Sequence, residues 1–248
     1  MLYSEIIATG SGLAERIIPN DFFDYLVDDA DNWIQSRTGI RERRFVNESQ
    51  STSDLATDAA KNALAEEGID AAELDCIIVA TSTPDMSLPA TACMVQKNIG
   101  AGNAFAFDMN AVCSSLVFGI EIADSFIKAG KCRTVMVIGA DTYSKILDFN
   151  DKGSCPLFGD GAAALILRAT AKPVGLLQSM IKSDGNGWEL IQVPSSGSRK
   201  PVTAETIANR ENFFVMEGKK VFIFATDINE ISNFRKPIRN KTIKNILN

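Results

Sequence analysis

The sequence predicts an α/β fold in which strands and helices alternate along the chain. Apolar runs of strand length recur, segments with helical spacing of apolar residues lie between them, and glycines follow several of these segments. This alternation indicates a layered domain with a mainly parallel sheet. The chain has 248 residues, 46% hydrophobic and 23% charged, which suffices for one large or two small domains with a sizeable core.

The N-terminal part contains one predicted strand followed by three predicted helices. We expect the strand over residues 6–12, where an apolar run ends in glycines. A helix over residues 20–27 and a shorter one over residues 31–38 follow. Ser53 is expected to cap a helix that extends to residue 67, where the next glycine stops it.

The middle of the chain contains the strands that we expect to form the core of the sheet. Residues 76–81 form an apolar run of strand length that is typical of a strand buried on both faces. A helix over residues 91–99 follows a proline-containing loop and ends at a glycine. Two further buried strands are predicted over residues 134–139 and 162–167, the second after a glycine turn at residues 159–161.

A change in the pattern near residue 170 indicates a second structural unit. It is predicted to begin with a strand over residues 174–181 and to continue through an irregular loop over residues 188–212 into a helix over residues 216–231. The last 17 residues contain neither alanine nor glycine and are rich in Asn, Lys and Ile. We therefore expect three parts, the last divergent and the second incomplete: residues 1–170, 171–231 and 232–248.

Charge and residue counts exclude several classes of function. The net charge of −6 and the scattered basic residues argue against a nucleic-acid-binding protein. No apolar run reaches the roughly 18 residues of a membrane span, and the N-terminus does not resemble a leader, so we expect a cytoplasmic protein. Five cysteines without a CxxC pair favour neither a disulfide framework nor a zinc site. The chain contains no histidine, the usual base for a catalytic cysteine.

Cys113 lies at the centre of the most informative stretch, residues 104–130. The first half of this stretch is apolar and predicts a buried strand, and the second half has apolar residues at helical spacing. Cys113 thus falls between a strand end and a helix start, where free backbone N–H groups and the positive end of the helix dipole favour a thiolate. From these residues alone, Cys113 is either a nucleophile or an inert buried thiol.

Five segments together resemble the β-ketoacyl-acyl-carrier-protein synthase III family of the thiolase superfamily. They occur in the order and spacing of that family from the N-terminus to about residue 231. The resemblance implies a thiolase-like layered αβαβα fold whose second half is truncated in this chain. The segments are WIQSRTGIRER (33–43), CIIVATST (76–83), DMNAVCSSLVFG (108–119), FGDGA (158–162) and MEG (216–218).

The resemblance also implies a reaction and its partners. Cys113 would take an acyl group, foremost acetyl, from an acyl-coenzyme A thioester. The acyl group would then condense with malonyl-acyl carrier protein as the latter loses CO₂, which initiates fatty acid biosynthesis. Coenzyme A thioesters are substrates here, and no permanently bound cofactor or metal is implied. The family resemblance further implies a homodimer.

Five more residues receive roles from the resemblance. Trp33 and Arg37 match the residues that hold the adenine and phosphates of coenzyme A. Lys152 stands where the family usually has a second arginine beside the adenine, so the cation is kept but its flat stacking surface is lost. Phe158 matches the aromatic residue that borders the acyl pocket. Leu88 falls where many relatives place an aromatic side chain that reaches the partner subunit's pocket.

One departure from the family limits the predicted activity. The family's catalytic histidine and asparagine lie beyond the helix predicted over residues 216–231, and no residue of this chain matches them. We therefore expect slow acylation of Cys113 with impaired or absent condensation. Two alternatives remain: a non-catalytic protein that binds coenzyme A or pairs with an intact synthase, and an unstable fragment. The sequence leaves open both the primer length and the choice between fatty acid and polyketide pathways.

Overall fold

A computed structural model of the chain describes residues 2–226, which fall into two compact units. The first unit is Met1–Ser183, and the second begins at Asp184. The predicted divisions after residues 170 and 231 rest on sequence patterns and stay predictions, and the tail at 232–248 lies outside the described residues. None of the helices within residues 2–226 combines the length and apolarity that a membrane crossing requires.

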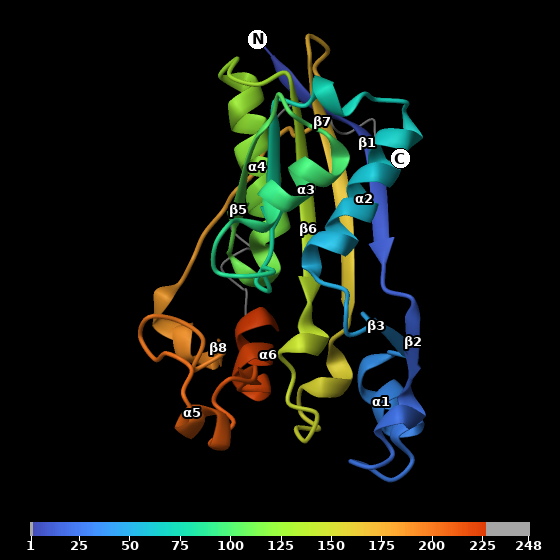
Figure 1. Cartoon of the computed structure of the whole chain (residues 1–248), viewed down its shortest axis with the longest axis vertical. Coiled ribbons are helices and arrows are strands. Elements are labelled where there is room, and N and C mark those ends of the chain that lie inside the picture. Colours follow the sequence, from blue (N-terminus) through green and yellow to red (C-terminus); the bar gives the residue numbers. More distant parts are fainter. Residues whose placement is uncertain (1, 227–248) are drawn as a thin grey trace. The chain divides into compact units, whose positions relative to one another are not determined.

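A five-stranded mixed sheet forms the centre of the first unit (Figure 1). β4 runs parallel to both β5 and β6, whereas β7 runs antiparallel to β6 and to β1. The prediction of a mainly parallel sheet is therefore wrong for the side of the sheet formed by β1, β7 and β6. The chain between β6 and β7 contains only short 3₁₀ turns, and a parallel return would need a longer crossover. In spatial order the strands are β1 (Tyr3–Leu13), β7 (Asp160–Thr170), β6 (Thr134–Thr142), β4 (Cys76–Ala80) and β5 (Phe105–Met109).

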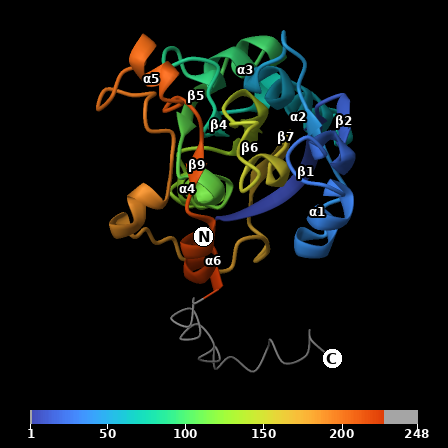
Figure 2. The ribbon, with the colours of Figure 1, turned by 90° about the horizontal axis from the view of Figure 1, so that it is seen from below.

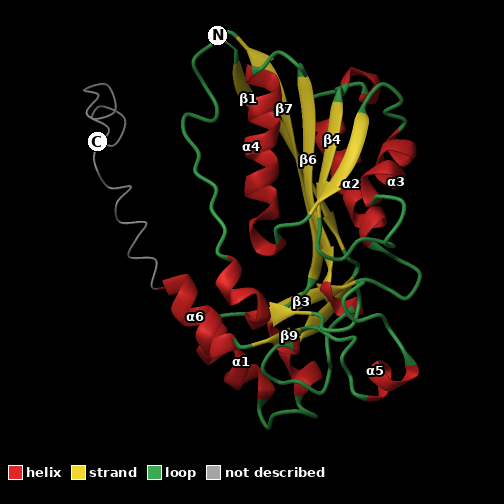
Figure 3. Ribbon diagram, turned by 90° about the vertical axis from the view of Figure 1, so that its left-hand side faces the viewer, coloured by secondary structure: helices red, strands yellow, loops and turns green. Residues whose placement is uncertain are grey.

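Helices cover both faces of this sheet. α2 (Thr52–Glu66) and α3 (Thr91–Ile99) lie on one face, and α4 (Ser115–Lys128) lies on the other (Figures 2 and 3). Each face has its own cluster of buried apolar residues. The sheet therefore separates two hydrophobic cores, as its apolar central strands require.

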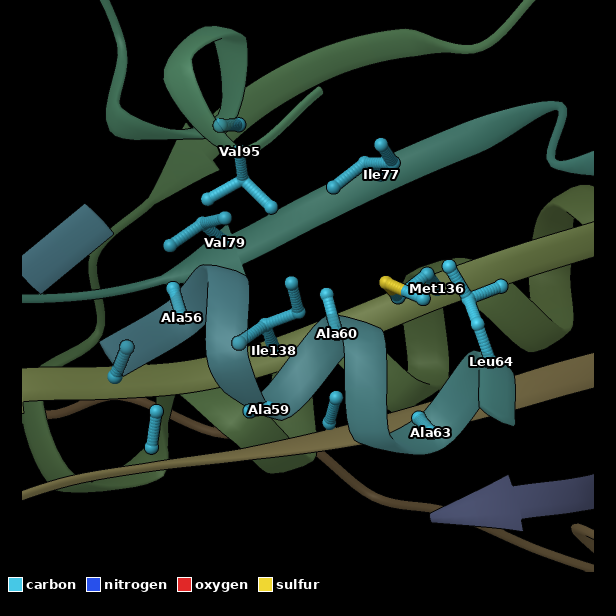
Figure 4. Packing of buried hydrophobic residues seen from close by; sticks show 14 of the residues in the cluster. Ala56, Ala59, Ala60, Ala63, Leu64, Ile77, Val79, Val95, Met136 and Ile138 are labelled. Atoms are coloured by element: carbon cyan, nitrogen blue, oxygen red, sulfur yellow. The ribbon is translucent and has the colours of Figure 1, made fainter. Parts of the chain in front are cut away.

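The packing of α2 on the sheet depends on small residues. Ala56, Ala59, Ala60 and Ala63 line the buried side of the helix, and β6 presents larger side chains such as Ile138 to it (Figure 4). A Cβ atom added at Gly12 on β1 would overlap the backbone carbonyl oxygen of Leu55. A Cβ atom added at Gly10 would likewise overlap the backbone of Ala59 and Ala63. Bare glycine backbone on β1 thus permits an unusually close approach of α2.

Two predictions about where helices begin in the N-terminal part of the chain are wrong. Instead of a helix over residues 20–27, the structure has a 3₁₀ turn at Asn20–Phe23. The Asp24 carboxylate accepts the Ala30 N–H at 3.1 Å, which turns the chain into α1 (Ala30–Thr38). The N-cap of α2 is Ser51 rather than Ser53, and its backbone N–H donates to the Asp54 carboxylate at 2.8 Å. The Ser53 N–H, by contrast, donates to the Asp85 carboxylate at 2.9 Å, a partner remote in sequence.

Other connections place short elements at the end of the sheet that carries the α4 N-terminus. β2 (Arg16–Pro19) pairs antiparallel with β3 (Glu42–Phe45), and α1 lies between them in sequence. The expected glycine turn at 159–161 is shorter than predicted, because Asp160 and Gly161 already belong to β7. The Asp160 carboxylate accepts the Val46 N–H and the Ser144 N–H at 2.8 Å each, which ties β3 and the chain after β6 to β7.

The strand predicted over residues 174–181 is absent. These residues run without a ladder partner beside α4, where the Lys128 ammonium donates to the Leu176 carbonyl at 3.4 Å and Ser179 donates to the Glu121 carboxylate. An apolar run forms a strand only when another strand supplies its backbone hydrogen bonds, and here no neighbouring strand of the described chain pairs with these residues.

The second unit is small and has little regular structure. Its region 188–212, predicted as irregular, does include one short helix and half of a two-stranded ladder. The helix predicted over residues 216–231 begins at Gly218 and is described as far as Thr226. The elements are a 3₁₀ segment (Gly185–Leu190), β8 (Ile191–Gln192), α5 (Ala204–Ala208), β9 (Val215–Met216) and α6 (Gly218–Thr226).

Candidate active site

Four chain segments meet at one edge of the sheet. The carboxyl ends of β4, β5 and β6 lie together, because Ala80 pairs with Met109 on one side and Gly139 on the other. β7 begins at the same edge, where Asp160 pairs with Thr142. Residues just after β4, β5 and β6 and just before β7 are therefore brought together. The carboxyl edge of parallel strands is a common place for functional side chains in α/β folds.

Cys113 lies at this edge, in a 3₁₀ turn over Val112–Ser114 between β5 and α4. Its thiol is exposed. The preceding Val112 adopts φ of 50°, a left-handed conformation that is strained for a β-branched residue. The turn is held by its own neighbours: the Val112 N–H donates to the Asn110 side chain at 2.9 Å, and the Ala111 N–H donates to the buried Ser115 hydroxyl at 2.6 Å. The structure thus places Cys113 at the strand-to-helix hinge that the sequence predicts.

Close packing of α4 on the sheet fixes the direction of its N-terminus. A Cβ atom at Gly119 would lie 2.7 Å from Val137 Cγ1, so only glycine fits at this contact without a shift. Leu116 packs over Gly139 at the end of β6. The first turn of α4, with its positive dipole end, is thereby held directly behind Cys113.

A half-buried carboxylate organises the turn that follows β4. Asp141 Oδ1 accepts the backbone N–H groups of Ser82 and Thr83 at 2.8 and 3.1 Å. It also accepts the hydroxyls of Thr81, Ser82 and Thr83. One side chain on β6 therefore fixes the whole 81–83 turn. Ser82 Oγ lies 3.2 Å from the Tyr143 hydroxyl as well.

Tyr143 and Phe158 form a stacked pair beside this turn. Their ring centroids are 5.0 Å apart with an interplanar angle of 9°, and Tyr143 is only 8% exposed. Burial raises the pKa of Tyr143, the Ser82 hydrogen bond opposes this, and the charges of Asp141 and Cys113 add to the rise. Sequence reasoning missed Tyr143, although its position directly after a buried strand was an available signal.

Trp33 and Arg37 form a second constellation on α1. They are one helical turn apart, and the Arg37 guanidinium carbon lies 4.7 Å from the centroid of the Trp33 ring. Arg37 Nη1 also donates to the Trp33 carbonyl oxygen at 3.1 Å. Trp33 is half-buried and Arg37 is exposed. An indole and a guanidinium in this arrangement offer a flat, cationic surface to a planar base.

Lys152 lies in the turn before the 3₁₀ segment Cys155–Leu157. This part of the chain is tied to the N-terminal region, since the Tyr25 hydroxyl donates to the Phe149 carbonyl at 2.7 Å. Lys152 itself is exposed and forms no hydrogen bond or ion pair with the other residues that the structure describes. Within the described residues, no hydrogen bond therefore joins Lys152 to Trp33 or Arg37.

Leu88 projects from the loop between β4 and α3 and is 84% exposed. The base of this loop is fixed, because the Asp108 carboxylate on β5 accepts the Thr91 and Ala92 N–H groups at 2.7 Å each. Asp108 therefore caps α3 from a neighbouring strand. A large apolar side chain on a fixed loop, left in solvent within one chain, is suited to contact a partner.

Within residues 2–226, no cluster of three or more Cys, Asp or Glu side chains is arranged to hold an ion. The chain has no histidine. Among the described residues at this edge of the sheet, Cys113 contributes an exposed thiol in the turn before α4.

Comparisons with known proteins give one consistent result. The family model of 3-oxoacyl-[acyl-carrier-protein (ACP)] synthase III matches residues 107–185. The β-ketoacyl-[acyl-carrier-protein] synthase III of Caldanaerobacter subterraneus subsp. tengcongensis is 46% identical over 90% of this chain and 67% of its own length. That of Natranaerobius thermophilus is 44% identical over 92% of this chain and 70% of its own length.

A solved structure agrees with these matches. The 3-oxoacyl-[acyl-carrier-protein] synthase III from Aquifex aeolicus VF5 superimposes with a TM-score of 0.78 at 37% identity, covering 88% of this chain and 66% of that one. The chain thus spans about two thirds of the length of the relatives that it matches. The predicted thiolase-like α/β fold is confirmed by this superposition.

Proposed function

The chain belongs to the β-ketoacyl-acyl-carrier-protein synthase III family of acyltransferases, and from this premise we propose that Cys113 accepts an acyl group from an acyl-coenzyme A thioester. Enzymes of this family initiate fatty acid biosynthesis by condensation. The observation that carries the proposal is the exposed thiol of Cys113 at the start of α4, on the sheet edge where β4, β5 and β6 end.

The geometry supports a simple acyl transfer. The Cys113 thiolate attacks the thioester carbonyl, the new S–C bond forms, and the coenzyme A thiolate leaves and takes up a proton. The positive end of α4 favours the thiolate before attack and the oxyanion during it. Acetyl-coenzyme A is the proposed first substrate, and malonyl-acyl carrier protein is the proposed second one. No permanently bound cofactor takes part, and these substrates place the reaction in the cytoplasm.

The remaining residues of the site receive proposed roles in binding. Trp33 and Arg37 hold the adenine and phosphates of coenzyme A, and Lys152 contributes a second cation. Phe158 borders the acyl group on Cys113. Leu88, exposed in the single chain, extends to the acyl site of a second copy in a homodimer.

Mass spectrometry of the acylated chain tests the proposal. Incubation with ¹⁴C-labelled acetyl-coenzyme A should give a covalent adduct of one acetyl group per chain, and digestion should locate it on the peptide that contains Cys113. Free acetate gives no adduct in the matched control, since it lacks the leaving thiolate. A chain that binds coenzyme A but never carries the acetyl group would contradict the proposal and favour a non-catalytic coenzyme A-binding protein or heterodimer partner.

The acetylated chain should stall before condensation. The 248 residues contain no histidine, whereas the family uses a histidine and an asparagine to stabilise the enolate of the malonyl group. A positioned acid–base group contributes roughly 10²–10⁴ in rate, so we expect ketoacyl product to form at least about 100-fold more slowly than with a histidine-containing family member. The rate of ketoacyl product formation is measured with radiolabelled malonyl-acyl carrier protein. Turnover at a comparable rate would refute the expectation.

Coenzyme A affinity tests the Trp33–Arg37 pair. Trp33→Ala should weaken binding about tenfold, because stacking of a base on an aromatic ring is worth about 1–3 kcal/mol. Trp188→Ala provides the control, since Trp188 is an exposed tryptophan that, like Trp33, carries an arginine: the Arg199 guanidinium carbon lies 5.1 Å from the centroid of its ring. Isothermal titration calorimetry measures both. If the two substitutions weakened coenzyme A binding equally, this would count against the assignment of Trp33 and Arg37 to coenzyme A binding.

A further inference from the structure

We propose that Arg43 is a positioning residue shared by the two parts of the acyl-coenzyme A site. Through Asn20 it holds the helix that carries Trp33 and Arg37, and through a backbone carbonyl it holds the chain that leads into Phe158. This inference rests on the proposed function, in which the Trp33–Arg37 pair binds coenzyme A and Phe158 borders the acyl group.

Arg43 on β3 is a cation in the interior of the first unit. Its side chain is only 7% exposed, and the guanidinium carbon lies 4.9 Å from the centroid of the Phe23 ring. Nη1 donates to the Ile18 carbonyl at 3.1 Å, and Nη2 donates to the Asn20 amide oxygen at 2.6 Å and to the Pro156 carbonyl at 3.0 Å. A buried charge is costly unless hydrogen bonds hold it. The planar guanidinium therefore fixes the chain at residues 18–20 relative to the chain at Pro156.

Asn20 extends this fixed arrangement to α1. Its side chain is 1% exposed, and its Nδ2 donates to the Asp31 carboxylate at 2.9 Å and to the Ile40 carbonyl at 2.8 Å. Asp31 lies in the first turn of α1, and Ile40 follows the glycine at which this nine-residue helix ends. One amide thus holds both ends of the helix on which Trp33 and Arg37 lie one turn apart.

The same guanidinium reaches the chain just before β7. Pro156 is buried in the 3₁₀ segment Cys155–Leu157, and Phe158 follows this segment directly. The backbone also passes close to Arg43 here, since a Cβ atom added at Gly159 would lie 3.0 Å from Arg43 Cβ. The hydrogen bond to the Pro156 carbonyl therefore fixes the course of the chain on either side of Phe158.

Removing the Asp31 carboxylate tests the connection through Asn20. Coenzyme A carries phosphates, so the loss of a negative charge near them would by itself tighten binding, whereas the loss of a hydrogen bond that holds α1 weakens it. We expect Asp31→Ala to weaken coenzyme A binding at least about threefold in isothermal titration calorimetry. The rate of Cys113 acylation at saturating acetyl-coenzyme A should stay within about twofold, because only binding depends on this connection.

Asp28→Ala is the matched control for this substitution. Asp28 is an exposed carboxylate shortly before the same helix, and it forms no hydrogen bond or ion pair with the other residues that the structure describes. The two substitutions remove the same charge, and only Asp31→Ala removes a contact with Asn20. Asp28→Ala should therefore leave the affinity for coenzyme A unchanged or raise it.

Arg43→Lys tests the centre of the network. Lysine keeps the positive charge but lacks the planar fork, so it cannot hold the three acceptors together. The affinity for coenzyme A and the acylation rate at saturation should both fall at least about tenfold, since a displacement of about 1 Å can cost about 100-fold in rate. Arg44→Lys makes the same change at the next residue of β3, whose half-buried side chain donates to the Ala14 carbonyl at 3.0 Å. Both quantities should stay within about twofold in that control.

The outcomes separate this inference from the proposed function. A wild-type chain that neither binds coenzyme A nor becomes acylated overturns the proposed function and this inference with it. Where the wild-type chain does both, losses in the Asp31 and Arg43 variants but not in their controls support the inference. An Asp31 variant that binds coenzyme A like the Asp28 variant, or a folded Arg43 variant with wild-type affinity and rate, overturns it while the acyl transfer stands. Circular dichroism shows whether the Arg43 variant folds, and if it does not, the two aspartate variants decide.

Discussion

Replacing Cys113 with alanine should abolish covalent acetylation by acetyl-coenzyme A. The acyl group is held by an S–C bond, and the remaining cysteines are poor substitutes. Burial raises the pKa of both Cys76 and Cys155 to about 12, and it also raises the pKa of Cys132. These thiols stay protonated near pH 7 and lie out of contact with solvent. The radiolabel on the intact chain, measured after gel filtration, should therefore fall to background.

Cys93 is the matched control for this experiment. It is the other exposed cysteine, and it lies in the first turn of α3, where the Asp108 carboxylate already accepts the Thr91 and Ala92 N–H groups. Cys93→Ala should retain the full label, because the helix start beside Cys93 is already capped by the Asp108 carboxylate and has no free N–H groups left for the oxyanion of an attacked thioester. Label that persists in the Cys113 variant, or that disappears in the Cys93 variant, would place the chemistry elsewhere.

Replacing Gly12 with alanine should lower the free energy of unfolding by about 3 kcal/mol, the upper part of the range for overpacked cores. The added Cβ would overlap the backbone carbonyl oxygen of Leu55. A backbone atom cannot rotate away, so α2 must move off β1. That movement disturbs the alanine-lined core of α2. Urea denaturation followed by circular dichroism measures the loss.

Gly102→Ala is the control, because a Cβ there meets no heavy atom within 4 Å. Its stability should change by no more than about 0.5 kcal/mol, as for an ordinary surface substitution. A Gly12 variant as stable as the Gly102 variant would mean that α2 and β1 are not as close in solution as the structure has them.

Local signals were sufficient for several elements. The helix predicted over residues 91–99 is found at Thr91–Ile99, with Gly100 in a left-handed conformation at its end. The buried strand after residue 75 and the hinge at Cys113 are likewise found where predicted. These features depend on neighbours within a few residues, such as an apolar run or a helix-ending glycine, so the sequence carries them directly.

The candidate site was predicted only in part. The position of Cys113 and the one-turn spacing of Trp33 and Arg37 are readable from the sequence. The hydrogen bonds from Ser82 and Thr83 to the Asp141 carboxylate are not, since they form only because β4 and β6 lie side by side in the sheet. The assigned roles of Trp33, Arg37, Lys152, Phe158 and Leu88 remain predictions until coenzyme A binding and acylation are measured.

The sequence by itself determined the family, the alternation of strands and helices, and the place of Cys113 between a strand and a helix. Tertiary structure alone decided the antiparallel β1–β7–β6 edge, the capping of α3 by Asp108 on β5, and the irregular course of residues 174–181. The physical reason is common to all three. A backbone hydrogen-bonding group is satisfied by whichever partner the fold brings to it, and that partner can lie anywhere in the chain.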